Sequence, residues 1–163
     1  MKSFVTAIIC LMALFLDGCG VNEETPVQLA NPFTDCETSE EAERISGFEF
    51  ESPEELEKWA SETVIRAEKG GMTELIYISG GQEIRARKAP GNEDISGIYE
   101  DFGDIEDTEL GGTEITVRGN KGLYNSVIWH DGDFSYSLSL SVPATAEDIT
   151  ALAALFIPGA ETD

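Results

Sequence analysis

Residues 123–141 read LYNSVIWHDGDFSYSLSLS, and this stretch decides the fold. Its second half, residues 134–141, alternates four large apolar side chains with four serines, a period of two that predicts a strand with one apolar and one small polar face. The first half, Leu123–Trp129, is another apolar run. Asp131-Gly132, between the two runs, is a strong hairpin signal. The stretch therefore predicts two paired antiparallel strands.

Further strands are expected on the N-terminal side of this hairpin, where short apolar runs are again bounded by turn residues. Gly80-Gly81 predicts the turn of one hairpin and Asn120-Lys121-Gly122 the turn of another. The sum is an antiparallel sheet of about five or six strands, near the usual sheet size. The additional strands are predicted at Thr63–Ala67, Thr73–Ser79, Gln82–Lys88 and Glu114–Arg118.

Capping chemistry predicts three short helices. Thr38 and Thr145 each precede a carboxylate by three residues, which is the spacing of a helix N-cap. Ser52-Pro53 places proline at a first helical position. The last helix carries apolar residues at helical spacing and is expected to close over the sheet, ending at Pro158-Gly159. We therefore expect an α+β fold, with two or three short helices on one face of a single antiparallel sheet.

Composition narrows the class of protein. The chain has 163 residues, 41% of them hydrophobic, and a net charge of −22. The apolar content is enough for a core, and the length is typical of a single domain. The negative field repels phosphate backbones, so nucleic acid is excluded as an expected partner. We expect a monomer.

The N-terminus has the pattern of an export signal. A short basic start is followed by a 13-residue run, Phe4–Leu16, with a single polar member. At 1.5 Å per residue the run would rise only about 20 Å, too short to span a bilayer permanently. Residues 1–18 are therefore expected to be a cleavable signal peptide.

The residues that end the run resemble the lipobox of bacterial lipoproteins, in which a lipid is attached to the cysteine thiol before cleavage. In Leu16-Asp17-Gly18-Cys19 the small Gly18 fits this pattern and Asp17 departs from it. The resemblance implies lipidation of Cys19, and two fatty chains make anchoring stable. We expect attachment at the extracytoplasmic face of the cell membrane. Ordinary secretion is the alternative that Asp17 leaves open.

Residues 19–37 are expected to be the lipidated cysteine and a flexible tether, followed by one domain at 38–157 and a tail at 158–163. Cys10 would leave with the signal peptide. If Cys19 carries lipid, Cys36 is left as a lone thiol. The alternative is a disulfide bond between Cys36 and Cys19, which would leave Cys19 without lipid.

Pro90–Gly112 lacks a regular pattern and carries many acids, so a functional or mobile loop is expected there. Several oxygens on such a loop could bind calcium loosely, although the spacing of a twelve-residue calcium loop is absent. The metal candidates are Asp94, Asp101, Asp104, Glu106 and Asp107.

No catalytic constellation is recognised in the sequence. His130 is the single histidine, and Asp131-Gly132 beside it is better explained as a turn than as a zinc site, which needs three or four ligands. Cys36 could act as a nucleophile only with His130 as its partner. The serines that alternate after residue 134 belong to the polar face of a strand. We therefore expect no enzyme activity, with no cofactor apart from the possible calcium.

Six short motifs lie within residues 31–157, namely Asn31-Pro32-Phe33, Ser39–Glu43, Gly47-Phe48, Glu93–Gly97 with Tyr99, Arg118-Gly119-Asn120 and the hairpin Trp129–Tyr136. With these motifs the mature chain resembles uncharacterised exported proteins, domain-of-unknown-function lipoproteins of Gram-positive bacteria. The resemblance implies a secreted or anchored single domain. More distantly, the strand-rich plan is similar to the curved sheets of lipoprotein-carrier and sigma-factor-regulator domains.

These features favour a membrane-anchored, noncatalytic binding or adaptor domain for a protein, peptide or envelope component. A carrier that holds an apolar ligand between a curved sheet and its helices is the first alternative, and a cavity beneath the last helix would favour it. A hydrolase that uses carboxylates of the acidic loop is the second, and it requires two carboxyl groups in one cleft.

Overall fold

The structure, a computed structural model, describes residues 31–160. The predicted signal peptide, Cys19, most of the predicted tether and the last three residues lie outside this part. Residues 32–160 belong to one compact unit.

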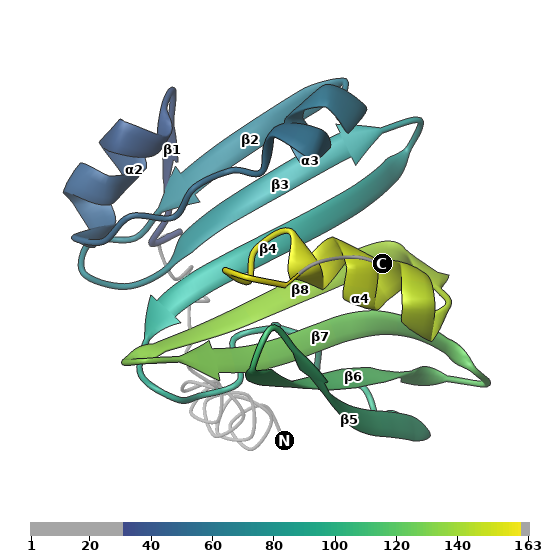
Figure 1. The fold of residues 1–163 in the computed structure, drawn as a ribbon. Helices are drawn as coiled ribbons and strands as arrows, with labels where there is room; N and C mark the ends of the chain where they lie inside the picture. Colours follow the sequence, from purple (N-terminus) through teal and green to yellow (C-terminus); the bar gives the residue numbers. More distant parts are fainter. Residues whose placement is uncertain (1–30, 161–163) are drawn as a thin grey trace, which may run out of the picture. The chain divides into compact units, whose positions relative to one another are not determined.

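Within residues 31–160, eight strands form a single antiparallel sheet (Figure 1). The sheet consists of two four-stranded meanders, β1 to β4 and β5 to β8, and the pairing of β4 with β8 joins them in the order β1-β2-β3-β4-β8-β7-β6-β5. The strands are β1 (Thr34–Cys36), β2 (Glu62–Ala67), β3 (Thr73–Ser79), β4 (Gln82–Pro90), β5 (Asp104–Leu110), β6 (Thr113–Asn120), β7 (Leu123–Asp131) and β8 (Phe134–Ala144).

The prediction of an α+β fold with five or six strands is wrong. The described residues form mostly one eight-stranded sheet, with three short helices. The six predicted strands are present, and the two that were missed, β1 and β5, are the edges of the sheet. An edge strand pairs on one side only, so it needs fewer apolar residues than a central strand and gives a weaker pattern. β5 lies inside the stretch predicted as an irregular loop, and β1 inside the stretch predicted as a tether.

The helices are α2 (Ser39–Ser46), α3 (Glu54–Trp59) and α4 (Ala146–Ala154). Thr38 and Thr145 are the N-caps of α2 and α4, as predicted, and each side chain accepts a hydrogen bond from the backbone N–H three residues later. The predicted cap of α3 is wrong. Its N-cap is Pro53, without a side-chain hydrogen bond, while the Ser52 hydroxyl instead pairs with the Tyr77 hydroxyl at 2.9 Å.

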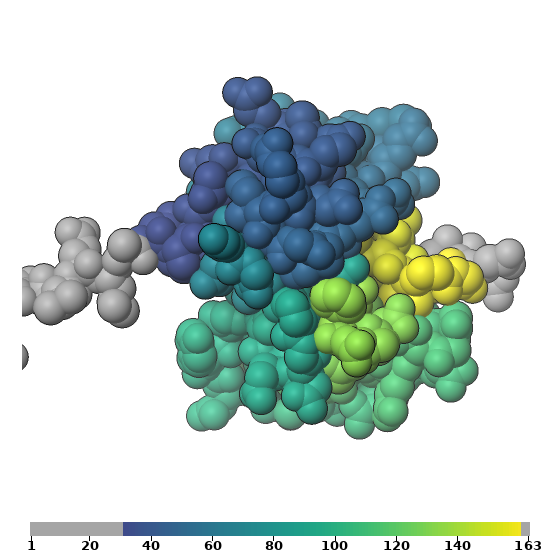
Figure 2. All heavy atoms as spheres, turned by 90° about the vertical axis from the view of Figure 1, so that its left-hand side faces the viewer, coloured from purple at the N-terminus to yellow at the C-terminus, as the bar shows by residue number. Residues whose placement is uncertain are grey.

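The core lies on one face of the sheet, here called the helix face. α3 contacts β3, and α4 contacts β7 and β8. Figures 1 and 2 agree that the C-terminal helix lies on the same side of the domain as α3. Alternate residues of the central strands point to this face, as the period of two requires. The largest side chains with almost no exposure there are Leu75, Tyr77, Ile115, Val117, Val127, Leu138 and Ile149.

The opposite face, here called the back face, is crossed by residues 91–103, which connect β4 to β5 behind β7 and β6 (Figure 1). We call this segment the strap. The Gly91 N–H donates to the Asp133 carbonyl, and the Gly91 carbonyl accepts from the Ser135 hydroxyl. The buried serines of β8 therefore lie beneath the strap and do not form a solvent-exposed face of the strand.

Candidate functional site

An open groove of about 740 Å³ lies on the helix face between α3 and α4. Its floor is made where the ends of β4 and β8 meet, and its two walls come from the helices. The volume falls in the range of small-ligand pockets, and the apolar lining is typical of them. The apolar residues that line the groove below its rim are Leu56, Ile84, Leu140, Leu152 and Leu155.

The rim of the groove carries exposed apolar side chains. Trp59 is 38% exposed, Leu123 46% and Val142 49%, and all three line the groove. Among residues 31–160 only two other large apolar side chains, Tyr99 and Ile105, are exposed to this extent, and neither lines it. Contiguous exposed apolar surface of this kind commonly marks a binding site.

A register shift in the sheet opens the groove. Tyr124 pairs with Ala144, but Ser126 pairs with Ser139, so the four residues 140–143 of β8 lie opposite the single residue Asn125 of β7. The extra residues of β8 bulge out of the ladder, as residues in a β-bulge do. The bulge is held to β4 by the Glu83 N–H, which donates to the Ser141 hydroxyl oxygen at 2.7 Å.

The charges around the groove are all of one sign. Glu55, Glu83 and Asp148 line it, and no lysine or arginine does so in the part of the chain that the structure describes. Glu83 is neutralised by Arg85 at 2.7 Å. Asp148, at the start of α4, accepts a hydrogen bond from the Thr145 hydroxyl. Glu55 is exposed on α3. The groove therefore presents an apolar floor below an acidic rim.

A second cavity of about 500 Å³ lies at the other end of α4 and is lined by aromatic rings. The ammonium group of Lys88 sits 4.5 Å from the centre of the Phe134 ring and 5.3 Å from that of Tyr136, within the range of cation–π attraction. It also donates to the Glu49 carbonyl at 2.7 Å. Burial lowers the pKa of Lys88, and the carboxylates of Glu49 and Asp131 oppose that effect. A cation of the chain itself therefore already lies against the aromatic rings that line this cavity.

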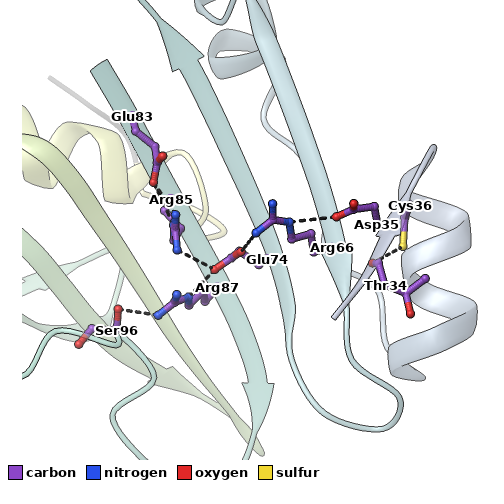
Figure 3. Close-up of polar contacts among 9 residues, drawn as sticks. All are labelled: Thr34, Asp35, Cys36, Arg66, Glu74, Glu83, Arg85, Arg87 and Ser96. Atoms are coloured by element: carbon purple, nitrogen blue, oxygen red, sulfur yellow. Dashed lines mark hydrogen bonds and ion pairs between the residues drawn. The ribbon is translucent and has the colours of Figure 1, made fainter. Parts of the chain in front are cut away.

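The back face holds a buried carboxylate surrounded by arginines (Figure 3). Glu74 in β3 is 2% exposed, and its carboxylate accepts from Arg87 Nε at 2.8 Å and from Arg85 Nη1 at 3.3 Å. Arg66 lies 3.8 Å away and pairs with Asp35 of β1 at 3.0 Å. Arg87 also donates to the carbonyl of Ser96 in the strap at 2.6 Å. The cluster joins the edge strand β1, the centre of the sheet and the strap.

Sequence reasoning missed this cluster, although a signal was available. Arg85 and Arg87 alternate with Ile84 and Ala86 on a strand that was correctly predicted, so both arginines had to share one face. Two partly buried cations on one face of a strand favour a nearby carboxylate, and Glu74 is the carboxylate that the β3–β4 register places opposite Arg87.

The calcium candidates are distributed along the strap and β5, and each has its own surroundings. Asp94 pairs with Arg118 at 2.5 Å, and Asp101 is exposed on the strap. Asp104 accepts from the Gly122 N–H, Glu106 from the Tyr124 hydroxyl, and Asp107 from the Thr116 hydroxyl. Nowhere in residues 31–160 do three or more histidine, cysteine or acidic side chains converge as a metal site would require.

His130 and Ser135 lie together, with the His130 Nδ1 3.2 Å from the Ser135 Oγ. Ser135 is buried, however, and its hydroxyl donates to the strap carbonyl of Gly91. A nucleophile must be reachable by substrate, so this pair is better explained as a contact that holds the strap.

Cys36 lies in the edge strand β1, with its sulfur 3.5 Å from the Thr34 carbonyl oxygen. Burial and the carboxylate of Glu41 raise the pKa of its thiol, which disfavours the reactive thiolate. The alternative pairing with Cys19 falls outside the described residues.

No helix of residues 31–160 has the length and hydropathy needed to cross a bilayer. No protein-family model, curated protein or solved structure matches this chain.

Proposed function

We propose that this chain is an extracytoplasmic lipoprotein, anchored to the cell membrane by a lipid on Cys19, and that its domain is a noncatalytic binding module. The observation that carries the binding role is the apolar groove with Trp59, Leu123 and Val142 exposed at its rim. Contact between water and these apolar side chains is unfavourable. A ligand that covers them is therefore stabilised by the hydrophobic effect.

The anchoring role is supported by the short apolar leader and by Cys19, which directly follows the small residue Gly18. The resemblance to exported domain-of-unknown-function lipoproteins of Gram-positive bacteria agrees with it. A lipid at Cys19 places the binding domain at the membrane surface, and 14 residues separate this cysteine from the first strand.

A noncatalytic role is supported by the surroundings of the reactive side chains. Ser135 is buried beneath the strap, and the thiol of Cys36 is held in its protonated form. The carboxylates of Glu55 and Asp148 occupy the rim of the groove rather than its floor.

A carrier of an apolar small ligand is a second candidate, because the groove has the volume of a small-ligand site and lies against the last helix. A carrier would retain its ligand during purification. Solvent extraction of the purified protein followed by mass spectrometry would recover an apolar compound in a one-to-one ratio for a carrier, and no such compound for a module that binds a protein or peptide.

The groove is tested with Nile red, an uncharged dye that fluoresces in apolar surroundings. Replacing Trp59 and Val142 by serine removes exposed apolar area without touching the core, so dye affinity should fall about tenfold, on the basis of about 25 cal/mol per Å² of lost contact. The matched control replaces Tyr99 and Ile105 by serine, since these side chains are more exposed than Trp59 and Val142 and lie away from the groove. Equal loss of dye in both variants would refute the groove as the binding site.

The anchor is tested by mass spectrometry of membrane-fraction protein from cells that produce either the natural chain or Cys19→Ser. The natural chain should begin at a diacylated Cys19, and the variant should leave the membrane fraction. Equal membrane retention of two unlipidated chains would refute lipid anchoring.

A further inference from the structure

We infer that the groove receives an apolar peptide segment flanked by lysine or arginine residues. This inference rests on the proposed use of the groove for binding, and it adds the chemical class of the ligand. It follows from the sign and placement of charge around an apolar floor.

The acidic residues are placed where they would meet the two ends of such a segment. Glu55 belongs to α3 and Asp148 to α4, so the carboxylates stand on opposite walls of the groove with the apolar floor between them. Within residues 31–160 neither carboxylate forms an ion pair with a basic residue, whereas Glu83 is neutralised by Arg85. Two carboxylates on facing walls fit cationic side chains that flank an apolar run.

The field of the whole chain acts in the same direction. A net charge of −22 repels fatty acids and anionic phospholipid headgroups, which are the common carriers of long apolar chains in a membrane. The same field attracts a cationic peptide and increases its association rate. Among ligands with enough apolar surface for the groove, the charge therefore selects a basic peptide over an anionic lipid.

The exposed rim also suits a peptide. Trp59 and Leu123 are too exposed for a small molecule on the floor to cover them fully, but an extended or helical segment that crosses the groove would contact both rim and floor. Peptide recognition commonly uses apolar anchors in a groove with charges at its edge.

The test uses the full chain, purified from membranes and reconstituted in phosphatidylcholine nanodiscs, with empty nanodiscs subtracted. The probes are fluorescein-labelled synthetic peptides with one alternating leucine–alanine run, flanked by lysines in one peptide and by glutamates in the other. Fluorescence anisotropy measures binding, and palmitate is the competing lipid. The lysine-flanked peptide should bind at least about tenfold more tightly than the glutamate-flanked one, and raising the salt concentration should narrow the difference.

Charge variants separate the groove from the general field. Glu55→Gln with Asp148→Asn should weaken binding of the lysine-flanked peptide about fivefold, since two exposed charge pairs are lost and each contributes only modestly. Glu93→Gln with Glu114→Gln removes the same charge from exposed sites outside the groove and should change affinity by less than about twofold.

Equal binding of the two peptides, or displacement of either by stoichiometric palmitate, would overturn the basic-peptide inference while Nile red still reports a working groove. Equal effects of the two charge variants would also overturn the inference, because the peptide would then be attracted by the net charge of the chain and not by the carboxylates of the groove. Failure of every probe, Nile red included, would instead refute the proposed binding function.

Discussion

Glu74 Oε1 lies 2.8 Å from Nε of Arg87, and this pair is part of a buried cluster on the face of the sheet opposite the helices. Arg87 in turn donates to the carbonyls of Ile95 and Ser96 in the strap. A single buried carboxylate therefore neutralises an arginine that holds a separate segment of the chain in place.

Replacing Glu74 by glutamine should lower the free energy of unfolding by about 3 kcal/mol, because removing one partner of a buried ion pair leaves the arginine charges uncompensated. Urea denaturation at neutral pH measures this loss. The control Glu114→Gln changes an exposed carboxylate and should cost less than about 0.5 kcal/mol. Equal costs for the two substitutions would show that the cluster contributes no more than surface charge does.

The hairpin that decides the fold was predictable because its pattern is local. Large apolar residues alternate with serines along residues 134–140 of β8, and Asp131-Gly132 turns the chain where predicted. The capping threonines of α2 and α4 were equally predictable, since a cap depends on residues three positions apart.

β5 was missed because Asp104–Leu110 carries four acids and is mostly exposed, a composition depleted in strands. Its position at the sheet edge requires little burial. Gly111-Gly112, with positive φ at both residues, was the available signal for the β5–β6 hairpin.

The groove could not be predicted in the same way. It depends on the register shift between β7 and β8 and on the spacing of α3 and α4 across the sheet. Neither quantity is a property of any short stretch of residues.

Asp94 should make stability depend on acid pH. Burial alone would raise the pKa of Asp94, but the Ser96 amide and the Arg118 guanidinium outweigh that effect and hold the pKa below its ordinary value. A carboxyl whose folded pKa is depressed stabilises the fold above its unfolded pKa, and this contribution disappears as pH falls through the folded pKa.

Asp94→Asn should therefore cost on the order of 1 kcal/mol at pH 7, a modest value because Asp94 is partly exposed, and almost nothing once the pH has fallen below the folded pKa of Asp94. Urea unfolding across that range measures the difference. The neighbouring Glu93→Gln is the control, and its cost should be small at both ends. A pH-independent cost for Asp94→Asn would contradict the role of its charge.

Tyr77 should make stability depend on alkaline pH. Burial raises the pKa of Tyr77 to about 12, with the Ser52 hydrogen bond acting in the opposite direction. A phenol whose folded pKa is raised favours the fold fully below its unfolded pKa of about 10, and the contribution is lost as pH rises through about 12.

Tyr77→Phe should remove that alkaline dependence and cost about 1 kcal/mol at neutral pH through the lost hydrogen bond to Ser52. Carbon-13 NMR of the tyrosine Cζ follows the titration, and Ser52→Ala separates the hydrogen bond from burial. A Tyr77 titration midpoint near 10 in the folded protein would contradict its desolvation.

Gly119 marks the second irregularity in the sheet, where the β6–β7 register shifts between Arg118 and Gly119. A Cβ at this position would lie 2.5 Å from the Tyr124 Cα and still closer to the Leu123 carbonyl oxygen, so the obstruction is backbone that cannot rotate away. Gly119→Ala should therefore cost more than about 3 kcal/mol, as overpacking against fixed atoms does.

Gly132→Ala is the matched control, because Gly132 has φ +57 and open space around it, and only the left-handed backbone strain of about 1 to 2 kcal/mol applies. Thermal unfolding compares the stability of the two variants. If Gly119→Ala is as stable as Gly132→Ala, β6 and β7 can separate at the register shift without loss of stability. Because Leu123, on the rim of the groove, adjoins this contact, Nile red affinity should fall in Gly119→Ala and stay unchanged in Gly132→Ala.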